Sequence, residues 1–363
     1  MQNDAHAKNF ADKMVDILNF GSLNLAMGLG YRAGLFDVMD AAEKPLSAEA
    51  ISRQANLNGR YVTEWLGVMV CGGIVDLVRG EDGTPCFFLP REHGDLLARR
   101  AGSGNLGVYT QEIPLLTTCA MERIFQGFRT GEGVPYEAYP DFHDFMGQLG
   151  DAKHRQVLVD VFLPSVDQGR LVAALKRGIA VCDLGCAQGV ATILMAQAFP
   201  ASHFTGIDIS AEALETARAN AREAGVDNIV FESRDAAELR HPNDLSARFD
   251  YVTAFDAIHD QTQPLEALQG IYEILKADGA FSMIDIAADS DIDGNRDHPM
   301  GAFLYTVSLM HCMPVGLVDG GAGLGMMWGR QQAETMLAQA GFGQVTVEAI
   351  PNDPFNLHFY CKK

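Results

Sequence analysis

The sequence has no pair of cysteines at CxxC spacing, although it contains seven cysteines in total. They are scattered from Cys71 to Cys361, and their number is odd. The missing CxxC pair argues against zinc ribbons and thiol–disulfide motifs. Scattered, reduced cysteines are typical of the cytoplasm, which is where we expect the protein to act.

Long apolar runs are also missing. The mostly apolar segment Ile179–Leu184 is far shorter than the roughly 18 residues that a membrane-spanning helix needs. The stretch Met1–Ala11 lacks an apolar core flanked by basic residues, so it does not resemble a secretory signal. We therefore expect no association with a membrane.

Positive charge is scarce. The chain has 27 Lys and Arg residues against 47 Asp and Glu residues, which gives a formal net charge of −20. Nucleic acids and anionic membrane surfaces are bound mainly through clustered Lys and Arg, so both are disfavoured as partners. A small molecule remains possible even if it is anionic, because a single local arginine can outweigh a diffuse field. The predicted partner is a small-molecule substrate.

The first hundred residues have a pattern typical of a winged helix. A chain of 363 residues favours more than one domain. Within residues 1–100, two amphipathic segments, Ala48–Gln54 and Arg60–Cys71, predict a helix–turn–helix. Ile74–Val78 and Cys86–Leu89 follow as a hairpin around Asp82-Gly83. The sequence therefore predicts an N-terminal, mainly helical, winged-helix-like domain.

The remaining chain divides into a helical linker and an α/β domain. Residues 101–170 mix helical pieces with a loop rich in Gly and Pro, which we interpret as the roof of a pocket. In residues 171–363, short apolar strands alternate with helices, which predicts a seven-stranded, mostly parallel, Rossmann-like sheet with helices on both faces. The predicted strands are Ile179–Leu184, His203–Ile209, Asn228–Glu232, Phe249–Phe255, Ala280–Ile286, Val345–Ile350 and Leu357–Cys361.

A glycine-bearing loop follows the first predicted strand, in the order Val181-Cys182-Asp183-Leu184-Gly185-Cys186-Ala187-Gln188-Gly189. Glycine lets a ligand approach the backbone, and the amides of such a loop can contact it. The dinucleotide fingerprint GxGxxG is absent, because Ala187 and Val190 occupy its second and third glycine positions. Acidic residues also close the next two strands, at Asp208 and Asp235. Ligands of such sheets bind at these strand ends.

Together, the loop and the two acids resemble class I S-adenosylmethionine-dependent methyltransferases. The resemblance implies that the loop wraps the methionine part of S-adenosylmethionine, that Asp208 binds the ribose and that Asp235 binds the adenine amino group. Phe255 would lie beside the methyl group. Ala187 departs from the family, which has a glycine there. The cofactor-binding residues implied in this way are Asp183, Gly185, Cys186, Gly189, Asp208, Ile209, Asp235, Ala236 and Phe255.

A histidine follows the fourth strand of the α/β domain, in Phe255-Asp256-Ala257-Ile258-His259-Asp260-Gln261. The unperturbed pKa of histidine suits general-base chemistry near neutral pH. The segment resembles the His-Asp-Trp segment of two-domain small-molecule O-methyltransferases. The resemblance implies that His259 is the catalytic base and that the adjacent Asp260 is a second catalytic residue. Gln261 stands where that family has tryptophan. Substrate contacts are expected from His311, Met313, Trp328 and Tyr136.

Several alternatives remain open at this point. A winged-helix DNA-binding regulator that senses S-adenosylmethionine, and an NAD-dependent oxidoreductase, are the two competing functions. The acceptor atom can be oxygen, nitrogen, sulfur or carbon, and a histidine base favours oxygen. No metal ion is expected, because Asp256, His259, Asp260 and Asp285 lack the tight spacing of a metal site. In the family that the chain resembles, the winged helix serves dimerisation, so a homodimer is expected.

Overall fold

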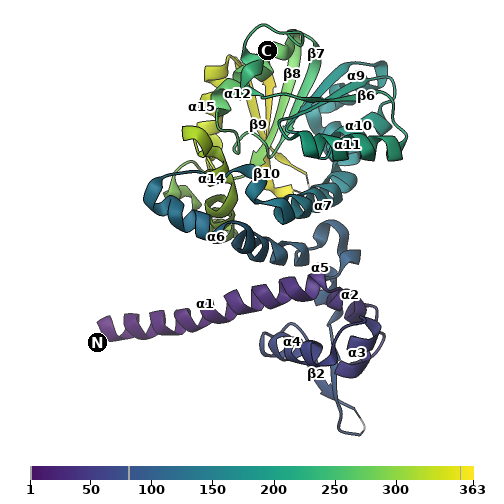
Figure 1. Ribbon diagram of the computed structural model, residues 1–363, viewed down its shortest axis with the longest axis vertical. Helices are drawn as coiled ribbons and strands as arrows, with labels where there is room; N and C mark the ends of the chain where they lie inside the picture. Colours follow the sequence, from purple (N-terminus) through teal and green to yellow (C-terminus); the bar gives the residue numbers. More distant parts are fainter. Residues whose placement is uncertain (1, 81, 352) are drawn as a thin grey trace. The chain divides into compact units, whose positions relative to one another are not determined.

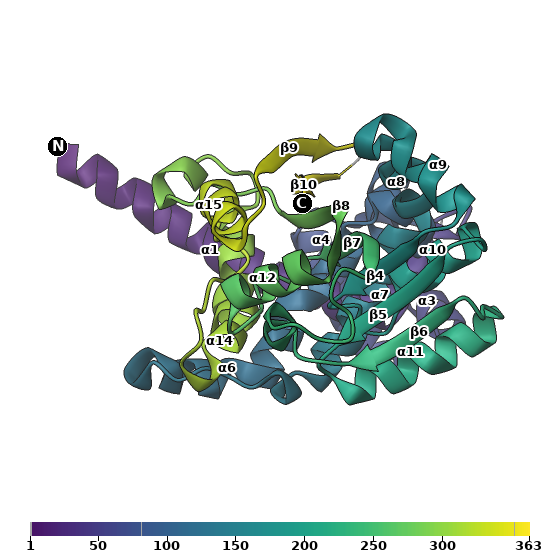
Figure 2. The ribbon, with the colours of Figure 1, turned by 90° about the horizontal axis from the view of Figure 1, so that it is seen from above.

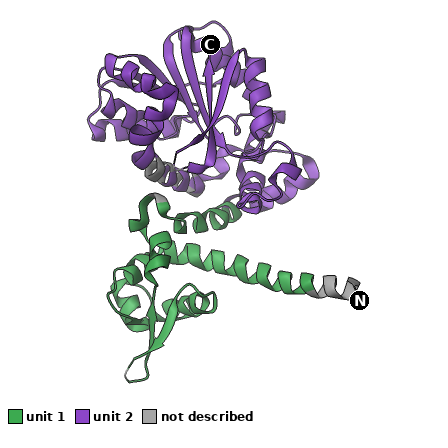
Figure 3. Cartoon of the chain, turned by 180° about the vertical axis from the view of Figure 1, so that it is seen from behind, with its two compact units in different colours: residues 1–118 green, residues 119–363 purple. Residues whose placement is uncertain are grey.

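The structure is a computed structural model that describes residues 2–80, 82–351 and 353–363. The chain forms two compact units, residues 1–118 and residues 119–363, which Figure 3 colours separately. Among the described helices, none is both long and apolar enough to cross a membrane. The boundaries expected at residues 100 and 170 stay a prediction.

The first unit has the order of elements that the sequence predicts for a winged helix (Figure 1). The Ser47 hydroxyl caps the first helix of the motif by accepting a hydrogen bond from the Ala50 amide at 3.2 Å. A two-residue strand that the sequence pattern is too short to reveal pairs antiparallel with the hairpin, so the wing has three strands. The elements are α1 (Gln2–Arg32), α2 (Leu35–Asp40), β1 (Leu46–Ser47), α3 (Ala48–Gln54), α4 (Gly59–Cys71), β2 (Asp76–Arg79), β3 (Pro85–Phe88), α5 (Arg91–Leu97), and the 3-10 turns η1 (Arg99–Gly104) and η2 (Gly107–Gln111).

A core of its own supports this first unit. Phe36, Leu66 and Met69 are almost fully buried there, and the ring of Trp65 lies edge-on to Phe36 at 5.3 Å. The indole N–H of Trp65 donates to the Ala26 carbonyl at 2.8 Å, which ties α4 to α1. Apolar burial and one satisfied indole therefore hold the helices of the unit together.

The second unit is built on a seven-stranded sheet in the order β6-β5-β4-β7-β8-β10-β9. The five strands from β6 to β8 are parallel, and β10 runs antiparallel between β8 and β9. The prediction of a seven-stranded, mostly parallel sheet is confirmed. The strands are β4 (Ala180–Leu184), β5 (His203–Asp208), β6 (Ile229–Ser233), β7 (Phe249–Phe255), β8 (Leu275–Ile286), β9 (Gln344–Ile350) and β10 (Asp353–Lys362).

Alternation along the strands produces two cores, one on each face of the sheet. Phe281 and Met283 of β8 enter the core shared with α12 and α15, whereas the adjacent Ile284 enters the core shared with α8, α9 and α10. Figure 2 shows α10 and α11 on one side of the strands and α12 and α15 on the other. The helices are α8 (Leu163–Ser165), α9 (Arg170–Arg177), α10 (Val190–Ala198), α11 (Ala211–Ala224), α12 (Pro264–Ile274), α13 (Gly301–Val307), α14 (Met313–Gly316) and α15 (Arg330–Ala340), with 3-10 turns η5 (Val166–Gly169), η6 (Ala237–Arg240), η7 (Ile292–Asn295) and η9 (Val318–Gly320).

The region before the sheet is more helical than its glycines and prolines suggest. The loop expected between Gly127 and Pro140 is shorter, because α6 (Glu112–Thr130) continues to Thr130 and α7 (Pro140–Val157) begins at Pro140, where proline is tolerated in the first helical turn. The 3-10 turn η3 (Tyr136–Ala138) lies between them. Two π-helical turns, η4 (Leu158–Phe162) and η8 (Ser308–Cys312), have no signature in the sequence pattern.

Candidate active site

The glycine-bearing loop after β4 has the backbone shape of a ligand cradle. Gly185 and Gly189 have φ angles of +73° and +78°, and Ala187 between them has a φ of +45°. Packing also demands the glycines, since a Cβ at Gly185 would lie 2.5 Å from Ala257 Cβ, and one at Gly189 would lie 2.7 Å from Phe231 Cζ. The Cys186 side chain is buried in the core against α11, so the loop offers its backbone rather than that thiol.

Asp183 lies inside the sheet and makes its bonds within the protein. Its two carboxylate oxygens accept hydrogen bonds from the hydroxyls of Thr192, at 2.6 Å, and Thr253, at 2.9 Å. Burial raises the pKa of Asp183 to about 6, and the two threonine hydroxyls oppose that rise. Asp183 therefore joins β4, α10 and β7 beneath the loop.

Asp208 closes β5 and faces the loop. Its Oδ2 accepts a hydrogen bond from the Ala187 amide at 2.8 Å, and its Oδ1 accepts one from the Ser210 amide at 2.9 Å. Burial raises the pKa of Asp208, and the amides of Ser210 and Ala187 partly offset this effect. The predicted meeting of the loop and Asp208 at one edge of the sheet is thus what the structure contains.

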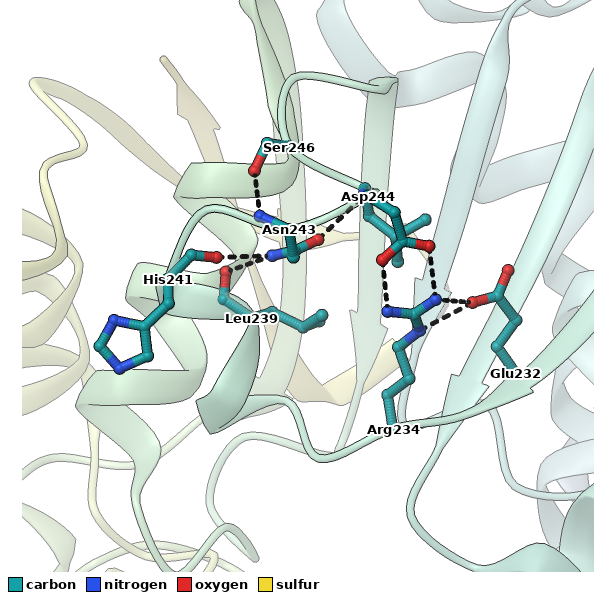
Figure 4. A network of polar contacts seen from close by, with 8 residues as sticks. Glu232, Arg234, Leu239, His241, Asn243, Asp244 and Ser246 are labelled. Carbon is teal, nitrogen blue, oxygen red and sulfur yellow. Dashed lines mark hydrogen bonds and ion pairs between the residues drawn. The ribbon is translucent and has the colours of Figure 1, made fainter.

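Asp235 follows β6, the neighbour of β5, and a network of ion pairs holds its backbone. Figure 4 shows the Arg234 guanidinium between Glu232 and Asp244, with both Asp244 oxygens accepting at 2.8 Å. The Asp235 carboxylate accepts a hydrogen bond from the Ala237 amide at 2.9 Å. Because paired charges fix Arg234 on both sides, the next residue in the chain has a defined place beside the end of β5.

His259 forms the centre of a second cluster, just after β7. Its Nδ1 lies 2.8 Å from Asp285 Oδ1 at the end of β8, and the two side chains are 3% and 1% exposed. The Ile286 amide donates to the same Asp285 oxygen at 2.8 Å, which leaves the imidazole Nδ1–H as the other donor. Asp285 thereby fixes the orientation of the ring and leaves Nε2 for chemistry.

Two further groups surround the Nε2 atom of His259. Asp260 Oδ1 lies 3.5 Å from it, and Cys312 is hydrogen-bonded to the ring. Burial alone lowers the pKa of His259, but the carboxylates of Asp285 and Asp260 outweigh burial and raise it well above the ordinary value. Burial raises the pKa of the Cys312 thiol to about 12. His259 therefore holds a proton more strongly than a free histidine does.

Aromatic side chains enclose His311 next to this cluster. The rings of Tyr139 and Phe142 lie 4.8 and 4.7 Å from the His311 ring, and Tyr136 lies 6.2 Å away. Burial lowers the pKa of His311, and Asp260, 3.8 Å away, opposes the shift. Burial and then the carboxylates of Asp208 and Asp260 raise the pKa of Tyr136. Tyr136 thus lies beside His311 and within electrostatic range of both Asp208 and Asp260.

The other predicted site residues lie in different surroundings, and not all of them are close to this cluster. Phe255 packs edge-on to the His154 ring at 4.9 Å, and Met313 is half-buried directly after Cys312. Ile209 is 70% exposed, whereas Ala236 and Trp328 belong to the core shared with α12 and α15. The structure brings His259, Asp260, His311 and Tyr136 together, but it places Trp328 in the core.

Reasoning from the sequence missed three contributors to this site: Asp285 as the partner of His259, Cys312, and Tyr139. Asp285 had a usable signal, because it stands at the carboxyl end of a parallel strand, as Asp208 does. Cys312 and Tyr139 had none, since the π-helical turn and the fold of residues 131–139 bring them in. The Tyr139 hydroxyl donates to the Met310 carbonyl at 2.8 Å, and the Val134 amide to the Pro314 carbonyl at 2.9 Å.

Comparison with known proteins agrees with this arrangement. Residues 175–341 match a family model described as a methyltransferase domain, and residues 21–99 match one described as an Rv2258c-like winged HTH domain. A demethylmenaquinone methyltransferase from Listeria welshimeri is 30% identical over 112 residues, or 31% of this chain and 46% of that relative, so the chain spans about half the length of this curated relative.

Two solved structures share the fold along nearly the whole chain. Human N-acetylserotonin methyltransferase in complex with SAM has a TM-score of 0.68 at 17% identity, and the match covers 97% of each chain. An O-methyltransferase family protein from Burkholderia thailandensis has a TM-score of 0.68 at 14% identity, covering 97% of this chain and 98% of that one. Residues 21–99 thus match a winged helix-turn-helix domain, and residues 175–341 match a methyltransferase domain.

Proposed function

We propose that the protein is a methyltransferase that transfers the methyl group of S-adenosylmethionine to a hydroxyl group of a small molecule. The observation that carries the proposal is the Asp208 carboxylate, which closes β5 and meets the loop of Gly185 and Gly189 through the Ala187 amide. A carboxylate in this position can accept both hydroxyl protons of a ribose. Asp235 at the neighbouring strand end suits the amino group of an adenine.

The residues of the chain fit this cofactor. The loop offers backbone amides, Asp208 offers acceptors, and Phe255, at the end of β7, offers an aromatic face on which a sulfonium is favourable. When bound, S-adenosylmethionine supplies an electrophilic methyl group on a good leaving group. The human structure of the same fold was determined with SAM, which supports the assignment.

His259 would act as the general base. In its neutral form His259 would take the hydroxyl proton at Nε2, and a bound S-adenosylmethionine would supply the methyl group to the acceptor oxygen. Asp285 orients the ring and stabilises the imidazolium that results. Asp260 lies on the same side as Nε2 and is a second carboxylate next to the developing charge. Alignment of the two reactants supplies much of the remaining rate.

Tyr136 and His311 would contact the acceptor. Both lie next to Asp260, and the aromatic rings of Tyr139 and Phe142 hold the His311 side chain in place. Burial lowers the pKa of His311, so at neutral pH it is a neutral donor and acceptor rather than a cation. A neutral, aromatic-rich wall favours a hydroxylated aromatic acceptor. Met313, directly after Cys312, is a further contact of this wall.

We also propose that the protein is a cytoplasmic homodimer. All seven cysteines are free thiols, which suits a reducing compartment. Large apolar side chains are exposed along α1, a pattern that marks an interaction surface. We call this set the α1 stripe, and its members are Phe10, Met14, Val15, Ile17, Leu18, Phe20, Leu25 and Leu29.

Nothing in the described structure favours the DNA-binding alternative. In α4, the helix that would read DNA, Arg60 is the one basic residue, and its guanidinium pairs with Glu64 on the same helix. A DNA-reading helix normally offers several unpaired basic groups.

Calorimetry with S-adenosylmethionine tests the cofactor assignment. Asp208→Ala should weaken binding at least tenfold, or about 1.4 kcal/mol. The exposed Asp227 offers a matched control, and Asp227→Ala should bind as the wild type does. Equal affinity of the two variants would contradict the proposed place of the ribose.

Measurement of turnover tests whether His259 is the general base. Purified protein, S-adenosylmethionine and a panel of phenols should yield S-adenosylhomocysteine, and His259→Ala should lower that yield while calorimetric cofactor binding stays intact. Turnover that survives in His259→Ala would remove His259 from the mechanism.

A further inference from the structure

Three potential metal ligands converge on one point in the second unit. His259, Asp260 and Cys312 each direct one donor atom to this point, and the three atoms lie within 4.8 Å of one another. They come from two separate parts of the chain, the segment after β7 and the π-helical turn η8. Convergence of an imidazole, a carboxylate and a thiol from distant segments is typical of a metal site and has little reason to arise from local sequence alone.

We propose that His259, Asp260 and Cys312 bind a divalent cation of intermediate softness, with Zn²⁺ and Co²⁺ as the fitting ions. Thiolate, imidazole and carboxylate are the ligands that zinc takes in proteins, and three protein ligands with a fourth position open to water is its catalytic form. The proposal goes beyond methyl transfer and does not depend on it.

The observed spacing fits tetrahedral coordination. Bond lengths of about 2.0–2.3 Å place neighbouring tetrahedral ligands about 3.3–3.7 Å apart. The His259 Nε2 to Asp260 Oδ1 distance is 3.5 Å, so these two ligands are already at that spacing. The Cys312 thiol lies within 4.8 Å of these two atoms, so it needs only a small movement to complete the three-ligand set.

Asp285 supplies the supporting contact that a metal-bound histidine needs. Ligating imidazoles almost always give their other N–H to a carboxylate or carbonyl, which fixes the ring and strengthens the ligand. The 2.8 Å contact between His259 Nδ1 and Asp285 Oδ1 has this form, and Asp285 is almost completely buried. Nε2 is thereby directed at Asp260 and Cys312.

The cluster also contains carboxylate oxygens that a cation could bind. Asp260 and Asp285 place two carboxylates around one imidazole, and among the described residues no lysine or arginine forms an ion pair with either of them. No described donor forms a hydrogen bond with Asp260 Oδ1 or Asp285 Oδ2, and both atoms are buried. A divalent ion would satisfy Asp260 Oδ1 directly.

Metal binding and base catalysis would both use the Nε2 atom of His259. Metal binding takes the lone pair of His259 Nε2, and the Cys312 thiol proton, with any proton on Nε2, leaves to the solvent. A bound ion therefore blocks the base, and the cation acts as an inhibitor of the proposed transfer rather than as its cofactor.

Co²⁺ titration of the full chain, stripped of metal with EDTA, tests the site without any methyl acceptor. Wild-type protein should bind one Co²⁺ and develop the near-ultraviolet charge-transfer band of a thiolate–cobalt bond. Cys312→Ser should abolish the band. Cys361→Ser removes another buried thiol, in β10, and should keep it. A wild type without the band, or a band that persists in Cys312→Ser, would overturn the proposal.

Zn²⁺ calorimetry adds two graded variants. Asp285→Asn should retain the site but bind Zn²⁺ about 10- to 100-fold more weakly, since the supporting carboxylate is lost. Asp260→Asn removes a ligand at a partly exposed position and serves if Cys312→Ser fails to fold. Unchanged Zn²⁺ affinity in Asp260→Asn would count against the site. S-adenosylmethionine affinity, measured on the same samples, reports separately on the proposed function.

Discussion

At the residue scale, Ala187 has a conformation that an L side chain rarely adopts. Its φ of +45° lies between two glycines that also have positive φ. A non-glycine residue in the left-handed region costs about 1–2 kcal/mol. The amide of Ala187 is nevertheless used, because it donates to Asp208. The loop therefore retains its shape with one methyl group more than the family pattern has.

Ala187→Gly should relieve this strain. We expect the free energy of unfolding to stay level or rise by up to about 1 kcal/mol, because relief of strain outweighs the added freedom of the unfolded chain. The matched control is Ala219→Gly at an exposed position of α11, which should cost about 1 kcal/mol. Urea denaturation measures both, and equal losses in the two variants would show that Ala187 is not strained.

Asp183 makes stability depend on pH. Its pKa rises from 3.8 to about 6 on folding, so the stabilising protonated form is complete below pH 3.8 and is lost as the pH rises through about 6. Asp183→Asn removes the buried charge. At pH 8 the variant should gain on the order of 3 kcal/mol over the wild type, and at pH 4 the gain should vanish.

Thermal unfolding at several pH values measures this difference. The control Asp227→Asn changes an exposed carboxylate and should give the same difference from wild type at every pH. An Asp183→Asn variant that is less stable than wild type at pH 8 would show that the hydrogen bonds from Thr192 and Thr253 outweigh the cost of burial.

At the element scale, the exposed face of α1 predicts the state of assembly. Leu18→Glu with Leu25→Glu places two charges in the α1 stripe and should convert a dimer into a monomer. Asn19→Glu adds a charge to the same helix at a position that is already polar and should leave the dimer intact. Light scattering coupled to size exclusion distinguishes the two masses. A wild-type monomer would contradict the proposed dimer.

The sequence pattern predicted the regular strands closely, but it did not predict the irregular π-helical turns. The strand β7 spans Phe249–Phe255, as its mostly apolar sequence predicts, because a parallel strand covered on both faces is largely apolar. The π-helical turn η8 escaped prediction, since its widened turn depends on packing and leaves no periodic signal. The His259–Asp285 pair required knowledge that β7 and β8 are neighbours, which spacing along the chain does not contain.

At the scale of the whole molecule, the two compact units have separate cores. Residues of the first core lie between 23 and 108, and those of the two sheet cores lie between 158 and 361. The proposed cofactor contacts belong to the second unit alone. A ligand that binds only the folded form of one unit stabilises that unit.

Differential scanning calorimetry should therefore resolve two transitions, and S-adenosylmethionine should raise only one. At a ligand concentration of 100 times the dissociation constant the gain is about 2.7 kcal/mol. This corresponds to a rise of roughly 5–10 °C for a unit of this size. The transition of an isolated fragment covering residues 1–118 identifies the one that should stay in place. Equal shifts of both transitions would contradict separate unfolding.

The hydrogen bonds that join residues 134 and 139 to the carbonyls of residues 314 and 310 have an evolutionary consequence. They build the wall around His311 from two segments that are outside the strands of the sheet, whereas Asp208 and the glycine loop belong to the strand ends. Mutation can therefore change this wall without changing the glycine loop or Asp208. Descendants of one ancestral gene can then diverge in the compounds that they modify and still use the proposed methyl donor.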